Sequence, residues 1–355
     1  SPLSPMDDIG VAWPTLDKDE ASASNDTATP DAEQRYSVRI EGLAADEQAE
    51  IDARFAALSA LKAGEKNPVN VAQLDRRARE DGDLLASLLR SRGYYDADIE
   101  TRVEPDGAGR LAVRLIADTG PRYTFDTVAV AGLEGAGVKE DALRSAFAVD
   151  AADPVDAEDV LTGKAELESV LARSGFPFAK VSEPDVVVDH DTGSATLAMK
   201  VDTGGERRFG GFIVKGDKPP FGAKHLGIIA RFKPGQPYDA TQIEDLRRAI
   251  IATSLVSTAD IAPVEGSAPG TADIAVTLEP APYRTISGSA GYDTGEGIRA
   301  EASWTHRNFL QPEGAFTLRG VLGTREQQAG ASLRMSNFRR RDQALNLRIA
   351  ASNIN

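Results

Sequence analysis

The spacing of apolar residues changes once along the chain, near residue 280. Before this point, segments whose apolar residues recur at helical spacing alternate with short segments in which every second residue is apolar. Beyond it, only the two-residue alternation continues, in stretches of about ten residues. The pattern therefore predicts an α+β region followed by an all-β region.

The α+β region repeats one order of elements three times: strand, short helix, longer helix, strand, strand. Each longer helix follows a Pro-x-Asn or Pro-x-Asp start, and Asn70, Asp156 and Asp239 are the expected N-caps. Such a repeat is expected to form a mixed three-stranded sheet with two helices on one face. The expected strands are 36–40, 98–104 and 111–117 in the first repeat, 123–130, 180–188 and 195–201 in the second, and 208–215, 256–264 and 272–278 in the third.

A glycine followed by aromatic residues ends the longer helix in the first two repeats. The motif reads Gly93-Tyr94-Tyr95 in the first repeat and Gly175-Phe176 in the second, 82 residues later. Glycine is common just past a helix end because it adopts the left-handed backbone conformation without strain. We interpret the motif as structural, with the aromatic rings packed where helix meets sheet. The third repeat has Ser254 and Leu255 at this place, so that helix end lacks its glycine.

In the all-β region, each expected strand has one apolar face and one polar or charged face. Strands of this length and pattern fit a transmembrane β-barrel with a water-filled interior. A soluble sandwich or a lipocalin-like barrel also fits the alternation, but frequent glycines and aromatic residues near the strand ends favour the membrane barrel. The aromatic residues expected at the membrane interface are Trp304, Phe309 and Phe338.

The all-β region is expected to be part of a barrel only. Five strands are recognisable between about residue 284 and Asn355, whereas a closed membrane barrel needs about eight. The alternation also continues up to the last residue. We therefore expect these strands to be the N-terminal part of an outer-membrane β-barrel whose remainder is missing.

Composition limits the partners. The formal net charge of −15 argues against nucleic acid as a ligand, because phosphate binding needs a basic surface. No cysteine is present, which excludes disulfides and thiolate metal sites. Residues 1–34 are polar and acidic and are expected to be a disordered leader. The expected domains are this leader, the first repeat at 35–119, the second at 120–203, the third at 204–281 and the barrel part at 282–355.

Candidate chemistry is sparse. His190, His225 and His306 lie in different parts of the chain, without the spacing of metal ligands. The segment 189–193 resembles the start of a calcium loop, but Lys200 stands where the bidentate glutamate should be, so a hairpin turn is expected. We predict no enzymatic activity, no metal and no cofactor.

Taken together, the motifs resemble the BamA/TamA family, outer-membrane assembly proteins built from POTRA domains and a β-barrel. The segments that carry the resemblance are Arg92-Gly93-Tyr94-Tyr95-Asp96-Ala97, Gly120-Pro121-Arg122-Tyr123, Gly175-Phe176-Pro177-Phe178-Ala179, Gly291-Tyr292-Asp293-Thr294, Arg307-Asn308-Phe309-Leu310 and Pro312-Glu313-Gly314. The likeness covers residues 35 to 355. Three repeats are similar to the TamA type, because BamA proteins usually carry five POTRA domains and two-partner secretion transporters two.

The resemblance implies three POTRA domains in the periplasm of a Gram-negative bacterium and a barrel in its outer membrane. Such a protein helps to fold, insert or translocate β-barrel proteins such as autotransporters. Its expected partners are unfolded client polypeptides, an inner-membrane-anchored TamB-like protein and outer-membrane lipid, with no nucleic acid. The third repeat is the one expected to hand substrate to the barrel.

The resemblance also places the lateral seam of the barrel at its first strand, about 283–292. The residues expected there are Tyr283, Ile286, Gly288, Ala290 and Tyr292. Small side chains on this strand would suit transient pairing with an incoming strand. Two alternatives remain: a secretion pore for one cognate polypeptide, and a barrel joined to a lipolytic domain.

Overall fold

The computed structural model describes residues 35–354, apart from 66, 107–109, 295–296 and 325. The expected leader 1–34 lies outside the described residues. Contacts divide the chain into two compact units. The first unit consists of the residues up to Ala86 together with Asp98–Asp118. The second consists of Ser87–Ala97 together with the residues from Thr119 onward.

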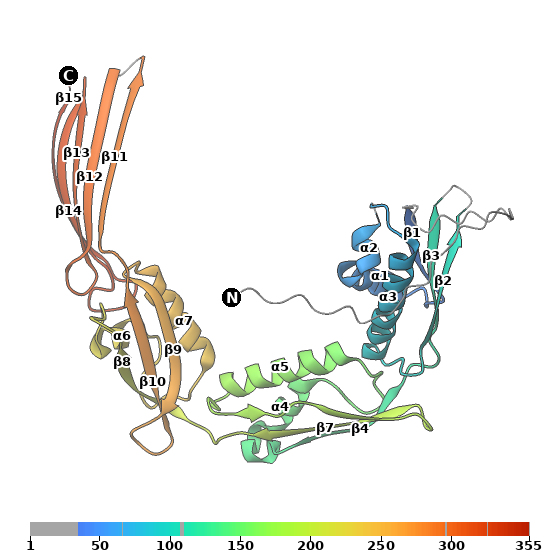
Figure 1. Cartoon of the computed structure of the whole chain (residues 1–355). Helices are drawn as coiled ribbons and strands as arrows, with labels where there is room; N and C mark the ends of the chain where they lie inside the picture. Colours follow the sequence, from blue (N-terminus) through green and yellow to red (C-terminus); the bar gives the residue numbers. More distant parts are fainter. Residues whose placement is uncertain (1–34, 66, 107–109, 295–296, 325, 355) are drawn as a thin grey trace, which may run out of the picture. The chain divides into compact units, whose positions relative to one another are not determined.

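The first repeat forms a three-stranded sheet in the order β1-β3-β2, with β1 parallel and β2 antiparallel to β3. Its helices lie on one side of this sheet (Figure 1). A short extra helix, α2, follows α1 because the buried carboxylate of Asp81 accepts hydrogen bonds from the Ser59 hydroxyl and the Leu61 N–H. The elements are β1 (Tyr36–Glu41), α1 (Gln48–Leu58), α2 (Ala60–Gly64), α3 (Val71–Ser91), β2 (Asp98–Pro105) and β3 (Leu111–Asp118).

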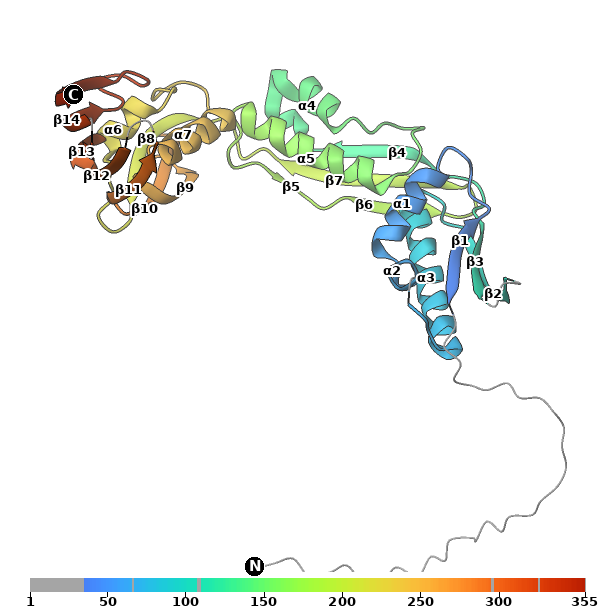
Figure 2. The same ribbon diagram turned by 90° about the horizontal axis from the view of Figure 1, so that it is seen from above.

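The second repeat has the same topology, with helix α5 running along its sheet (Figure 2). The prediction of a single strand at 180–188 is wrong. This segment is broken into β5 and β6 around Pro184, because proline has no N–H to donate to a sheet. The elements are β4 (Thr124–Ala131), the 3-10 helix η1 (Leu133–Lys139), α4 (Glu140–Phe147), α5 (Ala157–Arg173), β5 (Lys180–Val181), β6 (Asp185–Asp189) and β7 (Ser194–Asp202).

The third repeat forms the sheet β8-β10-β9, again mixed. The N-caps expected at Asp156 and Asp239 are confirmed, since their side chains accept the N–H groups of Glu158 at 2.9 Å and Thr241 at 2.8 Å. The elements are β8 (Arg208–Lys215), α6 (Ala223–Ile229), α7 (Ala240–Ala252), β9 (Val256–Glu265) and β10 (Thr271–Pro280).

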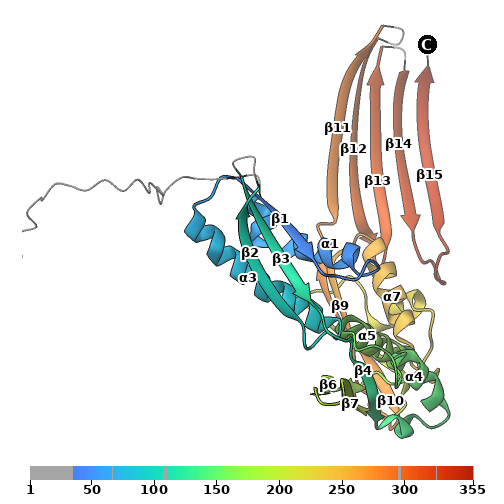
Figure 3. The ribbon, with the colours of Figure 1, turned by 90° about the vertical axis from the view of Figure 1, so that its right-hand side faces the viewer.

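The all-β region is one antiparallel sheet of five strands in chain order (Figure 3). The α+β region followed by all-β strands is therefore confirmed. None of the helices in the described ranges has both the length and the apolar character needed to cross a bilayer. The strands are β11 (Arg284–Asp293), β12 (Gly297–Leu310), β13 (Gly314–Gly323), β14 (Glu326–Met335) and β15 (Leu345–Ile354).

Candidate functional site

One face of the five-stranded sheet is apolar and open. Strand register aligns a row of large apolar residues next to a row of small ones, and the two rows border a hollow of about 790 Å³. Ile286 and Ile349, at the two ends of the large row, are 80% and 74% exposed. The large row is Ile286, Trp304, Leu318 and Ile349, with the small Ala331 between the last two, and the small row is Gly288, Ala302, Gly320, Ala329 and Ala351.

The opposite face of this sheet is polar, and its side chains bond from strand to strand. The pairs are Ser287 with Ser303 at 2.7 Å, Thr305 with Thr317 at 3.0 Å, and Glu301 with Arg319 at 2.8 Å. Several charged and hydroxyl groups on this face are thus paired with one another across strands. The sheet therefore separates an apolar side from a polar side, as the alternation in the sequence predicts.

Strand β11 forms an edge of the sheet and pairs with β12 alone among the described strands. The expected seam residues Ile286, Gly288, Ala290 and Tyr292 alternate along it on the apolar face. A Cβ added at Gly288 would meet only one backbone oxygen, at 3.6 Å. An edge strand presents unpaired N–H and C=O groups, and small side chains leave them accessible.

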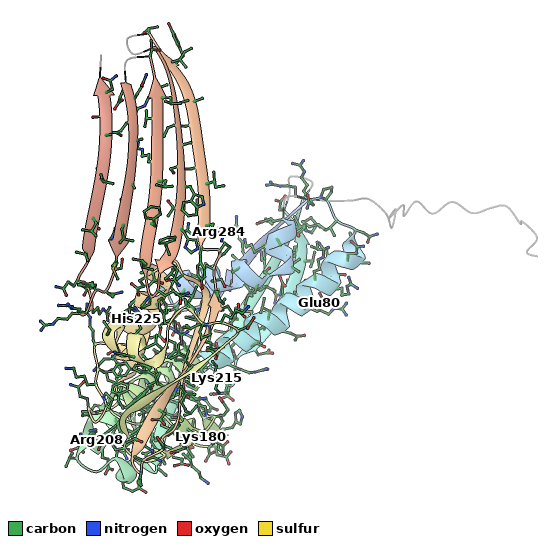
Figure 4. The ribbon with its side chains drawn as sticks, turned by 90° about the vertical axis from the view of Figure 1, so that its left-hand side faces the viewer. Glu80, Lys180, Arg208, Lys215, His225 and Arg284 are labelled. Carbon is green, nitrogen blue, oxygen red and sulfur yellow. The ribbon has the colours of Figure 1, made fainter. Side chains whose placement is uncertain are left out.

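Tyr283, the fifth expected seam residue, lies before the strand rather than on it. The strand begins at Arg284, at the base of the sheet (Figure 4). Tyr283 packs against the core of the third repeat, and its carbonyl accepts the Arg307 N–H at 2.7 Å. It belongs to the junction between the third repeat and the sheet.

A buried polar contact holds the β12–β13 turn to helix α6 at this junction. Nε2 of His225 lies 3.0 Å from Oε1 of Glu313, and their side chains are only 10% and 2% exposed. The amide of Asn337 donates to the other Glu313 oxygen at 2.8 Å. Figure 4 shows His225 near the base of the sheet. This contact is not recognisable in the sequence, because 88 residues separate its partners.

A second contact holds the β14–β15 turn to helix α7. The guanidinium of Arg341 binds both carboxylate oxygens of Asp245 and also donates to the Ile229 carbonyl at 3.1 Å. The hydrogen bond from Arg341 holds the pKa of the Asp245 carboxyl below its usual value. Two turns of the sheet are thus fixed to two helices of the third repeat.

Two of the three aromatic residues expected at the membrane interface lie in one cluster. The rings of Trp304 and Phe309 are 6.4 Å and 5.2 Å from the ring of Phe316, and His306 contacts both. Phe338 lies apart, in the β14–β15 turn, under the guanidinium of Arg339 at 5.2 Å.

The helix-stop motif contacts the following repeat. Gly93 and Gly175 adopt φ values of +89° and +103°, as a left-handed helix end requires. Their carbonyls accept the N–H groups of Tyr123 at 2.9 Å and Arg207 at 2.8 Å, where the next repeat begins. Ser254 adopts the same left-handed conformation in the third repeat, with φ of +56°, without being a glycine.

The aromatic residues of the motif are placed differently in the two copies. The ring of Tyr95 lies 5.4 Å from that of Tyr123, at the core of the second repeat. The prediction that this ring packs between the helix and the sheet of its own repeat is therefore wrong. Tyr94 lies 6.0 Å from the guanidinium of Arg122. Phe176, by contrast, is buried within the core of its own repeat. The motif therefore joins repeats as well as ending helices.

A polar cluster that the sequence did not indicate lies beside this joint. Asp96 accepts a hydrogen bond from the Tyr123 hydroxyl at 2.7 Å and lies 2.9 Å from Nδ1 of His190. Hydrogen bonds from Tyr123 and His190 lower the pKa of Asp96. Burial and Asp96 raise the pKa of Tyr123 to about 12. His190 lies in the turn expected at 189–193, where the Asp189 carboxylate accepts the Asp191 N–H at 2.9 Å.

The three histidines have separate partners, and no group of ligands suited to a metal ion occurs among the described residues. The arrangement brings together an open strand edge, a two-faced sheet and a polar junction. These features can bind a polypeptide strand and contact an apolar phase.

No protein-family model matches the sequence. Among solved structures, the chain is similar to BamA from Haemophilus ducreyi lacking POTRA domains 1–3, with a TM-score of 0.56 and 15% identity over 66% of this chain. The match covers 43% of that BamA chain, so this chain spans less than half of it.

Two further matches have lower TM-scores. POTRA domains 3–5 of Haemophilus influenzae BamA match at 0.40, with 15% identity over 70% of this chain and 96% of that one. CdiB from Escherichia coli matches at 0.36, with 13% identity over 87% of this chain and 51% of that one. The sheet topologies and the BamA match together establish that this chain has the fold of POTRA domains followed by part of an antiparallel β-barrel.

Proposed function

We propose that this chain is part of a TamA-type outer-membrane assembly factor. Its repeats form a periplasmic POTRA arm, and its strands belong to a barrel that helps to insert or translocate β-barrel proteins such as autotransporters. The protein acts without enzymatic chemistry or a cofactor. The observation that carries the proposal is the five-stranded sheet that follows three POTRA-type repeats, apolar on one face and polar on the other.

Three features support this function. Strand β11 carries the small residues Gly288 and Ala290, which suit transient pairing with an incoming strand through backbone groups, the way in which a sheet accepts a peptide strand. The exposed apolar face suits contact with outer-membrane lipid, and the polar face suits a wet barrel interior. The POTRA sheets place further strand edges, such as β2 and β9, on the preceding domains.

Crosslinking at the sheet edge tests the proposal. A photo-reactive residue at Ser289, on β11, should capture unfolded client barrels in the full-length protein in its membrane. The matched control is the same probe at Thr317, on the same polar face but in the central strand β13. Capture at Ser289 and not at Thr317 is the expected result. Equal capture at both positions would indicate a polypeptide passing through the interior, and thus a secretion pore.

The proposed inner-membrane partner is a TamB-like protein that binds the POTRA arm. The outer edge of β2 in the first repeat is a place for it, since β2 pairs only with β3 among the described strands. In an antiparallel strand, neighbouring residues direct their N–H groups to opposite sides. Of Thr101→Pro and Arg102→Pro, one should abolish co-purification of the partner while the sheet survives. Retention of the partner by both variants would refute this edge as the binding place.

A further inference from the structure

A second cavity lies at the junction, between the C-terminal half of α7 and the turns at the base of the five-stranded sheet. Its volume is about 760 Å³, within the range of about 300–1,000 Å³ typical of ligand sites. Four arginines line it, and we call it the arginine pocket. They are Arg248 on α7, Arg307 on β12, Arg334 on β14 and Arg341 in the β14–β15 turn.

Three of these guanidinium groups, those of Arg248, Arg307 and Arg334, form no ion pair within 4 Å among the described residues. Arg307 donates to the Pro282 carbonyl at 3.1 Å. Arg248 acts on a carboxylate only at longer range, where its charge helps to lower the pKa of Asp245. Arg341 is bound to Asp245, as described above. The chain as a whole carries a formal net charge of −15, so three unmatched cations around one cavity are a local reversal of its charge.

The two acids that line the pocket are already engaged. Glu313 is bound by His225 at 3.0 Å and Asn337 at 2.8 Å. Asp342 lies 3.7 Å from a guanidinium nitrogen of Arg231 and 3.8 Å from one of Arg341. Neither neutralises the three unmatched arginines.

The pocket opens on the polar side of the sheet. Arg334 alternates with Leu333 and Met335 of the apolar face, and Arg307 alternates with His306. Small side chains leave the space unfilled: Ala249, Ala252, Ala315 and Ala344. A ligand reaching the pocket therefore comes along the polar face, which in a barrel is the interior, rather than from the lipid side.

We propose that the arginine pocket binds a carboxylate-rich segment of a polypeptide entering the barrel interior. Guanidinium groups bind carboxylates with paired, charge-assisted hydrogen bonds, and three of them around one cavity suit several acidic side chains in succession. Phospholipid is the less suitable ligand because it contacts the apolar face. The assignment of a polypeptide as the ligand rests on the proposed function. The charge and the location of the pocket are observed independently of that function.

A binding measurement tests the proposal with the whole chain in detergent micelles. The probe is a fluorescent peptide of alternating Asp and Ser, and the comparison peptide has Asn in place of every Asp. The chain should bind the acidic peptide and not the neutral one. The combined Arg248→Gln, Arg307→Gln and Arg334→Gln variant should lose affinity by about tenfold or more, because three charge-assisted contacts are removed.

A matched variant separates the pocket from bulk charge. Arg39, Arg79 and Arg90 are exposed and lie outside the pocket, so their combined replacement by Gln removes the same charge. This control should change the affinity by less than about twofold, because exposed charges far from a ligand are screened. Equal losses in the two variants would overturn the proposal. Circular dichroism of both variants shows whether each has folded.

Two additional arms identify the ligand class. Inorganic phosphate and phosphatidylglycerol vesicles are offered to the same variants. Binding of vesicles that depends on the three pocket arginines, with no binding of the acidic peptide, would overturn the polypeptide assignment. Peptide binding at the pocket without client capture at Ser289 would support the pocket and refute the proposed insertion function, so the two failures are distinguishable.

Discussion

The second repeat and the five-stranded sheet share an alternation of apolar and polar residues but cover their apolar sides differently. In the second repeat, Phe125 and Leu197 are 1% and 0% exposed, because helices α4 and α5 share one core cluster with the sheet. In the five-stranded sheet, Ile286 and Leu322 are 80% and 71% exposed. An apolar face of this extent on a folded chain marks contact with a membrane or another protein. The difference teaches that one strand pattern serves two environments.

The connections differ as well. The joints between repeats combine backbone hydrogen bonds, accepted by the carbonyls of the glycines that end α3 and α5, with side-chain contacts such as Arg92 with Asp156 at 2.9 Å and Lys139 with Glu206 at 2.9 Å. The junction between the third repeat and the sheet contains the buried side-chain contact of Glu313 with His225 and the partly buried one of Arg341 with Asp245. The backbone part of such a joint is insensitive to most side-chain changes. Removing one partner of a buried polar contact, in contrast, leaves the other group unpaired and is destabilising.

The largest expected effect on stability is the difference between truncating a buried apolar residue and truncating an exposed one. Phe125→Ala should lower the unfolding free energy of the second repeat by about 3–5 kcal/mol, because it leaves a cavity in a buried core. Ile286→Ala should change stability by less than about 0.5 kcal/mol, as is usual for an exposed position. Hydrogen exchange resolved by segment measures both. A large loss from Ile286→Ala would mean that the apolar face is covered within the chain.

Much of the fold was predictable because its signals are local. The helix starts at Asp156 and Asp239 depend on residues two positions away, and the strand periodicity needs only neighbouring residues. Apolar residues on both sides of Pro184 predict one strand, so this pattern does not predict the break between β5 and β6.

The site was predictable only in part. The faces of β11 follow from alternation, so Ile286, Gly288, Ala290 and Tyr292 could be assigned to one side. The contacts of His190 and His225 could not be predicted, because their partners lie 94 and 88 residues away and no local pattern marks them. The sequence does carry one local signal, the excess of arginine in 334–341. Two of these arginines, Arg334 and Arg341, line the arginine pocket.

The next effect tests whether the apolar face contacts lipid. Leu318→Arg places a charge in the middle of β13 on this face and should cost about 2–4 kcal/mol of insertion free energy. Thr317→Arg, the neighbouring position on the polar face, should be tolerated. Folding into phospholipid vesicles, followed by protease protection, measures the difference. Equal behaviour of the two variants would contradict a membrane-facing sheet and favour a soluble one.

A smaller effect compares the helix ends. A Cβ at Gly93 would meet the Val155 carbonyl oxygen at 2.5 Å, and the residue has φ of +89°. Gly93→Ala should therefore destabilise the joint by about 1–3 kcal/mol. Ser254→Gly should instead stabilise the third repeat slightly, because glycine relieves its left-handed conformation. Thermal unfolding of both variants gives the signs. A destabilised Ser254→Gly variant would show that the serine side chain supports the junction.

The smallest effect concerns pH at the joint beside Asp96. Hydrogen bonds from Tyr123 and His190 lower the pKa of this carboxyl in the folded chain. Its contribution to stability is therefore present above the unfolded pKa of about 4 and is lost as the pH falls through the lower folded value. Asp96→Asn should remove this part of the acid sensitivity while the rest of the profile stays. Unfolding midpoints across the acidic range measure it, with Asp191→Asn, an exposed residue of the neighbouring turn, as the control. If Asp96→Asn left the acid profile unchanged, the cluster would contribute nothing to holding the joint, and its backbone hydrogen bonds alone would account for it.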